Sequence, residues 1–251
     1  MQGRIKTVLD YAIVNEYRGA NNPARWSGYL DTQLPAPNKI KTVKHQDSVP
    51  YIKVGDFMDK LRANGCTSSK ALQMLILTAV RSGSVRSADW DEVDLEKELW
   101  IIPAAHTKKT KANPKGQEHR VPLSPQAVDL LRTLPRIDGS SKIFPSPRGG
   151  ALSDMALSQI MRGMRERGEL IGEGVPHGFR STFRDWAADM TAYPDELRKV
   201  ASGHKVGDAV QQAYQRTDLL DKRRHLMIDW ANFLDRPITQ KANSKPLPGA
   251  R

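Results

Sequence analysis

The feature that most limits the possible folds is a helical spacing of apolar residues that recurs along much of the chain. In residues 3–17, apolar side chains fall at positions 5, 8, 9, 12, 13 and 14, so they share one helix face. We therefore expect a mainly helical fold. Further helices are expected at 54–62, 69–80, 125–134, 153–167, 178–190, 194–202, 207–216 and 219–235.

Residues 90–123 interrupt this pattern and favour strands. The short apolar run 99–102 ends at Pro103, and a second run covers 119–123. Between the two runs lies a polar stretch with a proline and a glycine, which predicts a long basic hairpin tip. Its lysines are Lys108, Lys109, Lys111 and Lys115. The fold class expected is therefore α+β, mainly helical, with a small antiparallel sheet.

Composition divides the chain into unequal parts. Residues 36–50 carry Pro, Lys and Asn without apolar periodicity, which is typical of a linker. Residues 1–35 are too short to bury a core alone, so we interpret them as the end of a helical domain. Residues 51–236 are expected to form the main domain, and the polar residues 237–251 a flexible tail.

The net charge of +11 favours a polyanionic partner such as nucleic acid, although a basic protein without such a partner fits it as well. The single cysteine, Cys66, excludes an internal disulfide and a thiolate-rich zinc site, and it fits a reducing cytoplasm. No apolar run approaches the length of about 18 residues that a membrane helix needs. We expect a cytoplasmic protein that does not bind membranes.

Three local clusters have the residue types of a phosphate site. Arg81 directly follows an apolar helical segment, and His177 and Arg180 are spaced to share one face at a helix start. His204 precedes Tyr214 on the next predicted helix. Taken singly, each has a plainer interpretation: a helix-terminal cation, a capping histidine with a surface arginine, and a core aromatic. Their combination and order point to phosphate chemistry.

That order, Arg, Lys, His-x-x-Arg, His, Tyr, resembles the tyrosine recombinases (phage integrases), and most closely the integrases of prophages and genomic islands. The resemblance covers nearly the whole chain. It includes LTAVRSG, WIIPA, HRVPLS, PHGFRSTFRDWA, QQAYQR and DLLDKRRHLMIDWANFLD. It implies the catalytic-domain fold of that family, with the small sheet on one edge, over residues 51–236. Residues 1–35 would then be the end of a core-binding domain.

The resemblance also implies roles for individual residues. Tyr214 is the nucleophile and Lys108 matches the hairpin lysine, with Lys109 and Lys111 close enough to compete for that role. The other implied catalytic residues are Arg81, His177, Arg180 and His204. We expect DNA contacts from Lys109, Lys111, Lys115, Arg120 and Arg184.

These residue types suit phosphodiester cleavage. Arginine forks donate paired hydrogen bonds to the charge that develops on phosphate oxygens. A tyrosine, with a pKa of about 10, needs a base or a strongly cationic site to attack, and a lysine can protonate the leaving oxygen. We expect neither metal nor cofactor. The carboxylates near Trp90 are interpreted as a solvated turn rather than a metal site; they are Asp89, Asp91, Glu92 and Asp94.

The implied function is site-specific recombination through a 3′-phosphotyrosine, for integration or excision of a mobile element. The implied partner is double-stranded DNA, bound by a tetramer, with a monomer in its absence. Ser84 stands where the family commonly carries an acidic residue that helps to hold the first arginine. A truncated, weakly active DNA-binding remnant is therefore the alternative, while a relaxing topoisomerase fits the flanking motifs less well.

Overall fold

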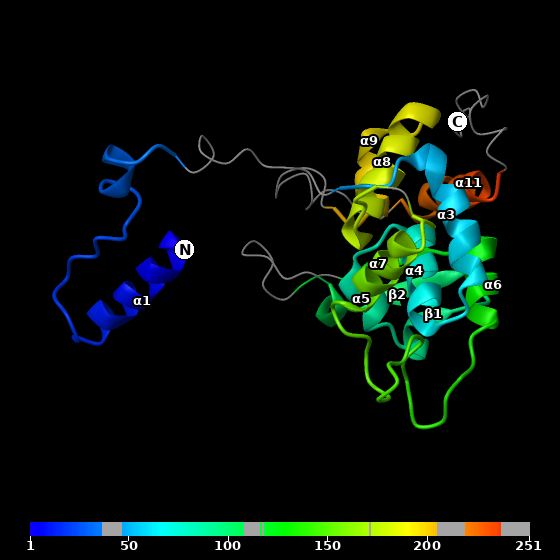
Figure 1. The fold of residues 1–251 in the computed structure, drawn as a ribbon, viewed down its shortest axis with the longest axis horizontal. Coiled ribbons are helices and arrows are strands. Elements are labelled where there is room, and N and C mark those ends of the chain that lie inside the picture. Colours follow the sequence, from blue (N-terminus) through cyan, green and yellow to red (C-terminus); the bar gives the residue numbers. More distant parts are fainter. Residues whose placement is uncertain (37–46, 108–115, 117, 171, 205–218, 237–251) are drawn as a thin grey trace. The chain divides into compact units, whose positions relative to one another are not determined.

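The computed structural model describes residues 1–36, 47–107, 116, 118–170, 172–204 and 219–236. The chain divides into two compact units, Met1–His45 and Gln46–Arg251 (Figure 1). The smaller unit contains helix α1 (Gln2–Val14) and a 3-10 turn, η1 (Leu30–Thr32). The expected helix at 3–17 is confirmed, and it ends earlier than the apolar spacing suggested.

The larger unit contains a three-stranded antiparallel sheet in the order β1–β2–β3. The strands are β1 (Val93–Asp94), β2 (Leu99–Ile102) and β3 (His119–Pro122). Leu99 pairs with Pro122 and Ile102 with His119, so β2 and β3 form the predicted hairpin. Strand β1 lies within residues 90–123, where strands were expected, but its bounds were not predicted, because two residues are too few to show an alternating pattern.

The helices of the larger unit follow the predicted ranges closely. Among the described residues, the short helix α5 was not predicted, and the helix expected at 207–216 lies outside them. The helices are α3 (Tyr51–Ala63), α4 (Thr67–Thr78), α5 (Ser82–Arg86), α6 (Pro125–Arg132), α7 (Ala156–Glu166), α8 (Phe179–Met190), α9 (Asp195–Ala201) and α11 (Leu220–Leu234). The 3-10 turns are η2 (Trp90–Glu92), η3 (Ala104–His106) and η4 (Pro176–Gly178).

Helix α4 lies at the centre of the core. Its apolar residues are buried on every side, and α3, α6, α7, α8 and α11 all contact it. An aromatic cluster joins α8 to α11, with the rings of Trp186 and Trp230 4.9 Å apart. The indole nitrogen of Trp230 donates to the carbonyl of Ile76 at 2.8 Å, which ties α11 to α4. Across the described part of the chain, no helix has both the length and the apolar character to span a membrane.

Gly178, in the PHGFR sequence, lies so close to the segment 47–49 that no larger residue fits there. The hydroxyl of Thr182 donates to the carbonyl of Val49 at 2.6 Å, so the segment is held against the start of α8. A Cβ added at Gly178 would lie 2.2 Å from the carbonyl oxygen of Asp47. Because that contact is with backbone, rotation of a side chain cannot relieve it.

Gly178→Ala is therefore expected to lower the free energy of unfolding by about 2 kcal/mol, as for other overpacked positions. Gly163→Ala is the matched control, since an added Cβ in α7 would meet the flexible end of Arg167 at 3.4 Å. Its better helix propensity should raise the free energy of unfolding by about 0.5–1 kcal/mol. Urea denaturation measures both, and equal effects would contradict the packing argument.

Candidate active site

Arg180, on α8, is the most deeply fixed cation of the candidate site. Its side chain is buried, and Nη1 donates to the carbonyl oxygen of Ala79 at 2.9 Å. Ala79 has a left-handed backbone (φ 51°) that ends α4 and turns its carbonyl toward α8. Burial first, then the charges of Arg81 and Arg184, lower the pKa of Arg180 to about 10. Arg180 therefore stays charged at neutral pH.

Arg81 lies immediately before α5, where the chain leaves the end of α4. Partial burial lowers the pKa of its guanidinium. Gly203 packs against it, because a Cβ added there would lie 3.4 Å from Nη1 of Arg81. Gly203 also has a φ of +67°, a backbone conformation that glycine adopts without strain. Arg81, from the turn between α4 and α5, and Arg180, from α8, thus place their charges at one site.

His204 completes this group from the end of α9. Its Nε2 lies 3.4 Å from Nη2 of Arg180, and its Nδ1 lies 2.9 Å from the hydroxyl of Ser202. Burial, then the charges of Arg180 and Arg81, lower the pKa of His204 to about 4. The ring is therefore neutral at pH 7, with Nε2 placed to accept from Arg180 and Nδ1–H to donate to Ser202.

His177 lies in η4, immediately before α8, and is exposed. Its charge is one of those that lower the pKa of His204, so the two histidines lie near each other. Of the predicted catalytic residues, the structure thus brings together Arg81, His177, Arg180 and His204. Lys108 and Tyr214 lie outside the described residues.

His119, the first residue of β3, is a member of this group that the sequence analysis missed. Its Nε2 is buried and has no hydrogen-bond partner among the described residues, while the ring is hydrogen-bonded to the backbone of Ala201. The ring lies beside Arg81, since both are within 3.5 Å of a Cβ position at Gly203. Alternation along the strand was the available signal: His119 and the buried Val121 point to the same face.

His119 should make the fold sensitive to acid. Burial first, then the charges of Arg223, Arg180 and Arg81, lower its pKa from 6.5 to about 4. The unfolded chain therefore takes up a proton more readily, so the free energy of unfolding should fall as pH drops from about 6.5 to 4. His119→Asn, which keeps a donor for Ala201, should reduce that dependence in urea titrations. An unchanged pH dependence would contradict this, and the exposed His225 of α11 provides the control.

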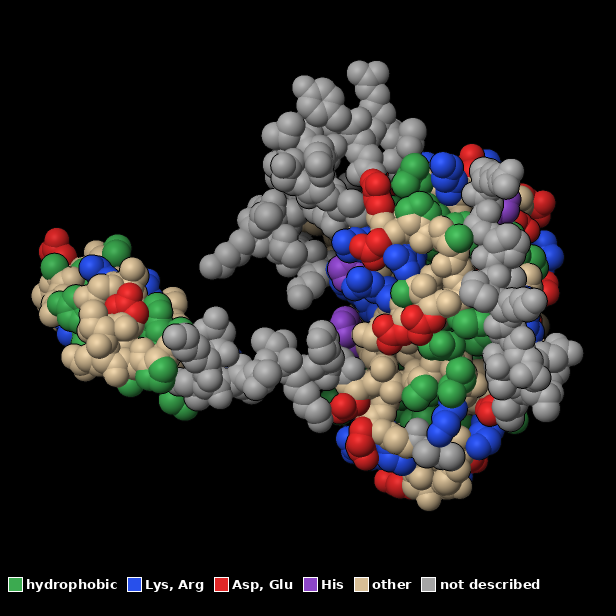
Figure 2. Space-filling view, turned by 90° about the horizontal axis from the view of Figure 1, so that it is seen from above, with side chains coloured by type: hydrophobic (Ala, Val, Ile, Leu, Met, Phe, Trp, Pro, Cys, Tyr) green, Lys and Arg blue, Asp and Glu red, His purple; other side chains and the backbone are tan. Residues whose placement is uncertain are grey.

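The predicted DNA-contact residues are only partly described. Arg184 lies on α8 with its side chain 42% exposed, and its nearest approach to Asp195 is 3.9 Å. Arg120 lies on β3, and its carbonyl accepts from the buried Arg223 of α11. Figure 2 shows Lys or Arg side chains gathered with histidines on the larger unit. Three further predicted contacts, Lys109, Lys111 and Lys115, lie outside the described residues.

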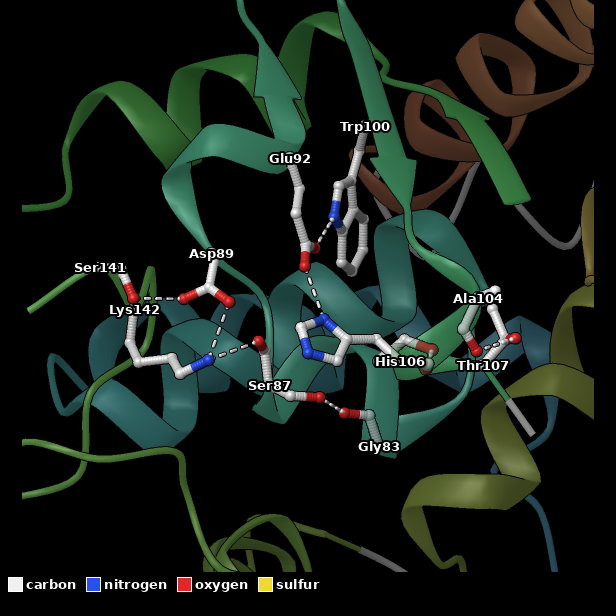
Figure 3. Close-up of polar contacts among 11 residues, drawn as sticks. Gly83, Ser87, Asp89, Glu92, Trp100, Ala104, His106, Thr107, Ser141 and Lys142 are labelled. Carbon is white, nitrogen blue, oxygen red and sulfur yellow. Dashed lines mark hydrogen bonds and ion pairs between the residues drawn. The ribbon is translucent and has the colours of Figure 1, made fainter. Parts of the chain in front are cut away.

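The acidic residues near Trp90 were predicted to form a solvated turn, and two of them do not. The side chains of Asp89 and Glu92 are only 17% and 7% exposed, so that interpretation is wrong for both. Asp89 pairs with Lys142 at 2.8 Å, and Glu92 contacts Trp100 and His106 (Figure 3). Ligand atoms of Asp89, Glu92 and His106 lie within 4.8 Å of one another. Because these carboxylates already accept from protein donors, the cluster is a hydrogen-bonded network that contains the ion pair between Asp89 and Lys142.

The chain belongs to the phage integrase family, which it matches over residues 52–219. It is 30% identical to the integrase of Enterobacteria phage P4 in an alignment of 245 positions that covers 94% of this chain and 54% of that protein. The chain therefore spans about half the length of this relative.

Solved structures show the same fold. A lambda integrase(75–356) dimer bound to a COC′ core site has a TM-score of 0.56 at 17% identity, covering 86% of this chain and 71% of that chain. A lambda integrase tetramer bound to a Holliday junction also has a TM-score of 0.56, at 16% identity, covering 84% of this chain and 57% of that chain. The expected fold class is confirmed.

Proposed function

We propose that this chain cleaves and rejoins double-stranded DNA in site-specific recombination, for integration or excision of a mobile element. The observation that carries the proposal is the convergence of Arg81, Arg180 and His204 from three separate elements. Two arginines forced so close together repel each other, and burial adds to the cost of their charge. An anion between them, such as a scissile phosphate, would relieve both effects.

In this mechanism, Arg81 and Arg180 donate to the nonbridging oxygens of the phosphate, where charge accumulates in the transition state. His204 adds a donor once the bound phosphate raises its pKa, since a nearby negative charge favours the protonated ring. The phenol of Tyr214 loses its proton to solvent in this cationic site, and its oxygen attacks phosphorus and forms a 3′-phosphotyrosine. The P–O5′ bond breaks, and O5′ takes a proton from Lys108. Reversal of these steps with another 5′-hydroxyl rejoins the strand without ATP.

The lambda integrase structures, a dimer bound to a COC′ core site and a tetramer bound to a Holliday junction, support DNA as the substrate and assembly of several copies on it. We propose a tetramer on DNA, a monomer without it, and a cytoplasmic location, where the substrate is found. The organised arginine–histidine group argues against a weakly active remnant, because a protein that only binds DNA has no need of two mutually repelling arginines, one buried and one partly buried. Ser84, in the position of the usual acid, is buried and donates to the carbonyl of His106 at 2.9 Å.

The test is a nicked suicide substrate, in which the cleaved end diffuses away and the covalent intermediate is trapped. The proposal expects a protein–DNA adduct that resists denaturant and disappears on protease treatment. Phosphoamino-acid analysis of the adduct should show phosphotyrosine. Tight DNA binding without any adduct would instead support the remnant.

A further inference from the structure

His119, at the start of β3, has a buried ring nitrogen that the proposed mechanism does not use. The ring is hydrogen-bonded to the backbone of Ala201, and this contact by itself raises the pKa of the imidazole. A contact that favours the protonated ring is one in which the ring donates, so a ring N–H donates to the carbonyl of Ala201. Because Nε2 has no hydrogen-bond partner among the described residues, the donor is Nδ1.

The Nε2 edge of the His119 ring lies near Arg81, with Gly203 beside both. A Cβ added at Gly203 would lie 3.5 Å from Nε2 of His119 and 3.4 Å from Nη1 of Arg81, so the two nitrogens approach the same point. Gly203 places no side chain there, and its φ of +67° is one that other residues adopt with strain. The backbone at Gly203 therefore leaves His119 accessible to the Arg81 guanidinium.

The surrounding charges keep His119 neutral. Burial first, then the charges of Arg223, Arg180 and Arg81, lower its pKa to about 4. At pH 7 its Nε2 therefore carries a lone pair and no proton. Because a lone pair beside guanidinium groups can only accept, Nε2 is an acceptor placed next to a cation of the candidate site.

We infer that His119 is a positioning residue for strand cleavage, whose Nε2 accepts a hydrogen bond from Arg81 when the scissile phosphate is bound. The inference rests on the proposed function, in which Arg81 donates to that phosphate. Hydrogen bonds of an active site are often long in the free protein and tighten in the complex with substrate, which fits two nitrogens that are close and not yet bonded.

The chemistry of the guanidinium allows both contacts at once. It carries five N–H donors in a plane, so Arg81 can donate to His119 and still direct other donors to a phosphate. Arg180 is held in the same way, since its Nη1 donates to the carbonyl of Ala79. Each arginine then has one protein acceptor that fixes its plane, and a fixed plane matters because small misplacements at a reacting centre slow the reaction greatly.

Two substitutions of His119 separate positioning from packing. His119→Asn carries its amide near the Nδ1 position, so it keeps a donor to Ala201 and places no acceptor at the Nε2 position. His119→Gln does the reverse, because its longer side chain brings an amide oxygen to the Nε2 position and gives up the contact with Ala201. Both are assayed in single turnover on the nicked suicide substrate, with DNA binding and the free energy of unfolding measured separately.

His119→Asn should slow cleavage by about tenfold, part of the roughly 100- to 1,000-fold that one preorganised donor contributes. His119→Gln should cleave at close to the parent rate, although it should be the less stable variant because it loses a hydrogen bond. Tyr193→Phe controls for lowered stability, since it loses the hydrogen bond to Asp229, and it should cleave at the parent rate.

Arg81→Ala tests whether His119 acts through Arg81. In the Arg81→Ala chain, His119→Asn should slow cleavage by less than about twofold, because the effects of residues that act through one another are not additive. A second measurement does not need cleavage. NMR of the chain labelled with ¹⁵N in histidine, with His119→Asn used to assign the signal, should show a protonated Nδ1 and an unprotonated Nε2 at pH 7.

Three results would overturn the positioning role: a proton on Nε2 at pH 7, the full tenfold slowing by His119→Asn in the Arg81→Ala chain, or faster cleavage by His119→Asn than by His119→Gln. If the parent chain forms no adduct, the proposed function fails and this inference fails with it. If the parent chain forms the adduct and His119→Asn cleaves at the parent rate, only the positioning role is lost.

Discussion

Tyr214→Phe is expected to abolish the covalent protein–DNA adduct while leaving DNA binding nearly intact. The substitution removes the single oxygen that would bond to phosphorus, and no other group of the phenylalanine ring can replace it. Binding depends on phosphate contacts from basic side chains, which the loss of one hydroxyl hardly changes. Adduct formation on a nicked suicide substrate and binding by gel shift, at one salt concentration, measure the two quantities.

Tyr193→Phe provides a control that separates chemistry from folding. The Tyr193 hydroxyl donates to the carboxylate of Asp229 at 2.8 Å, and burial with that hydrogen bond raises the pKa of the phenol. Its loss should lower stability by about 1 kcal/mol and leave the adduct in place. An adduct that persists in Tyr214→Phe would show that another residue is the nucleophile and would end the mechanism proposed above.

Much of this fold could be predicted because the apolar spacing that indicates a helix lies within each helix itself. The apolar spacing of α4 and α11 gave both helices to within a few residues, and the run at β2 ended at Pro103 as expected. The bounds of elements of a few residues could not be predicted, for a physical reason. Helix α5 and strand β1 are shorter than the window over which a periodicity can be recognised, and tertiary contacts determine them.

The candidate site divides in the same way. Arg180 and His204 belong to motifs that can be recognised in the sequence alone. The contact between them could not be predicted, because it depends on how α8 and α9 pack. His119 lies in a short strand and Glu92 in a 3-10 turn, and neither belongs to a recognisable motif. Only their burial and their hydrogen-bond partners in the folded structure show what they do. Glu92 in particular belongs to a run of acids that suggested solvent exposure, and its side chain turns inward because Trp100 and His106 supply donors.

Arg180→Lys is expected to slow strand cleavage by about 100- to 1,000-fold, the usual cost of losing a preorganised donor to developing charge. Lysine keeps the positive charge and can still donate to the Ala79 carbonyl, so the fold and the attraction for DNA should survive. It cannot direct one donor to Ala79 and a second toward the His204 side of the site, as the planar guanidinium does. The measurement is the single-turnover rate on the nicked substrate, with binding followed separately.

Arg167→Lys is the matched control, because Arg167 makes its own forked pair with Glu169 on the surface, where its side chain is 51% exposed. Surface pairs of this kind contribute little to stability, so the cleavage rate and the fold should both be unchanged. If Arg180→Lys also cleaves at the parent rate, charge alone is sufficient at this position. The buried fork, fixed between Ala79 and His204, would then have a structural role, and the argument for transition-state stabilisation would depend on Arg81.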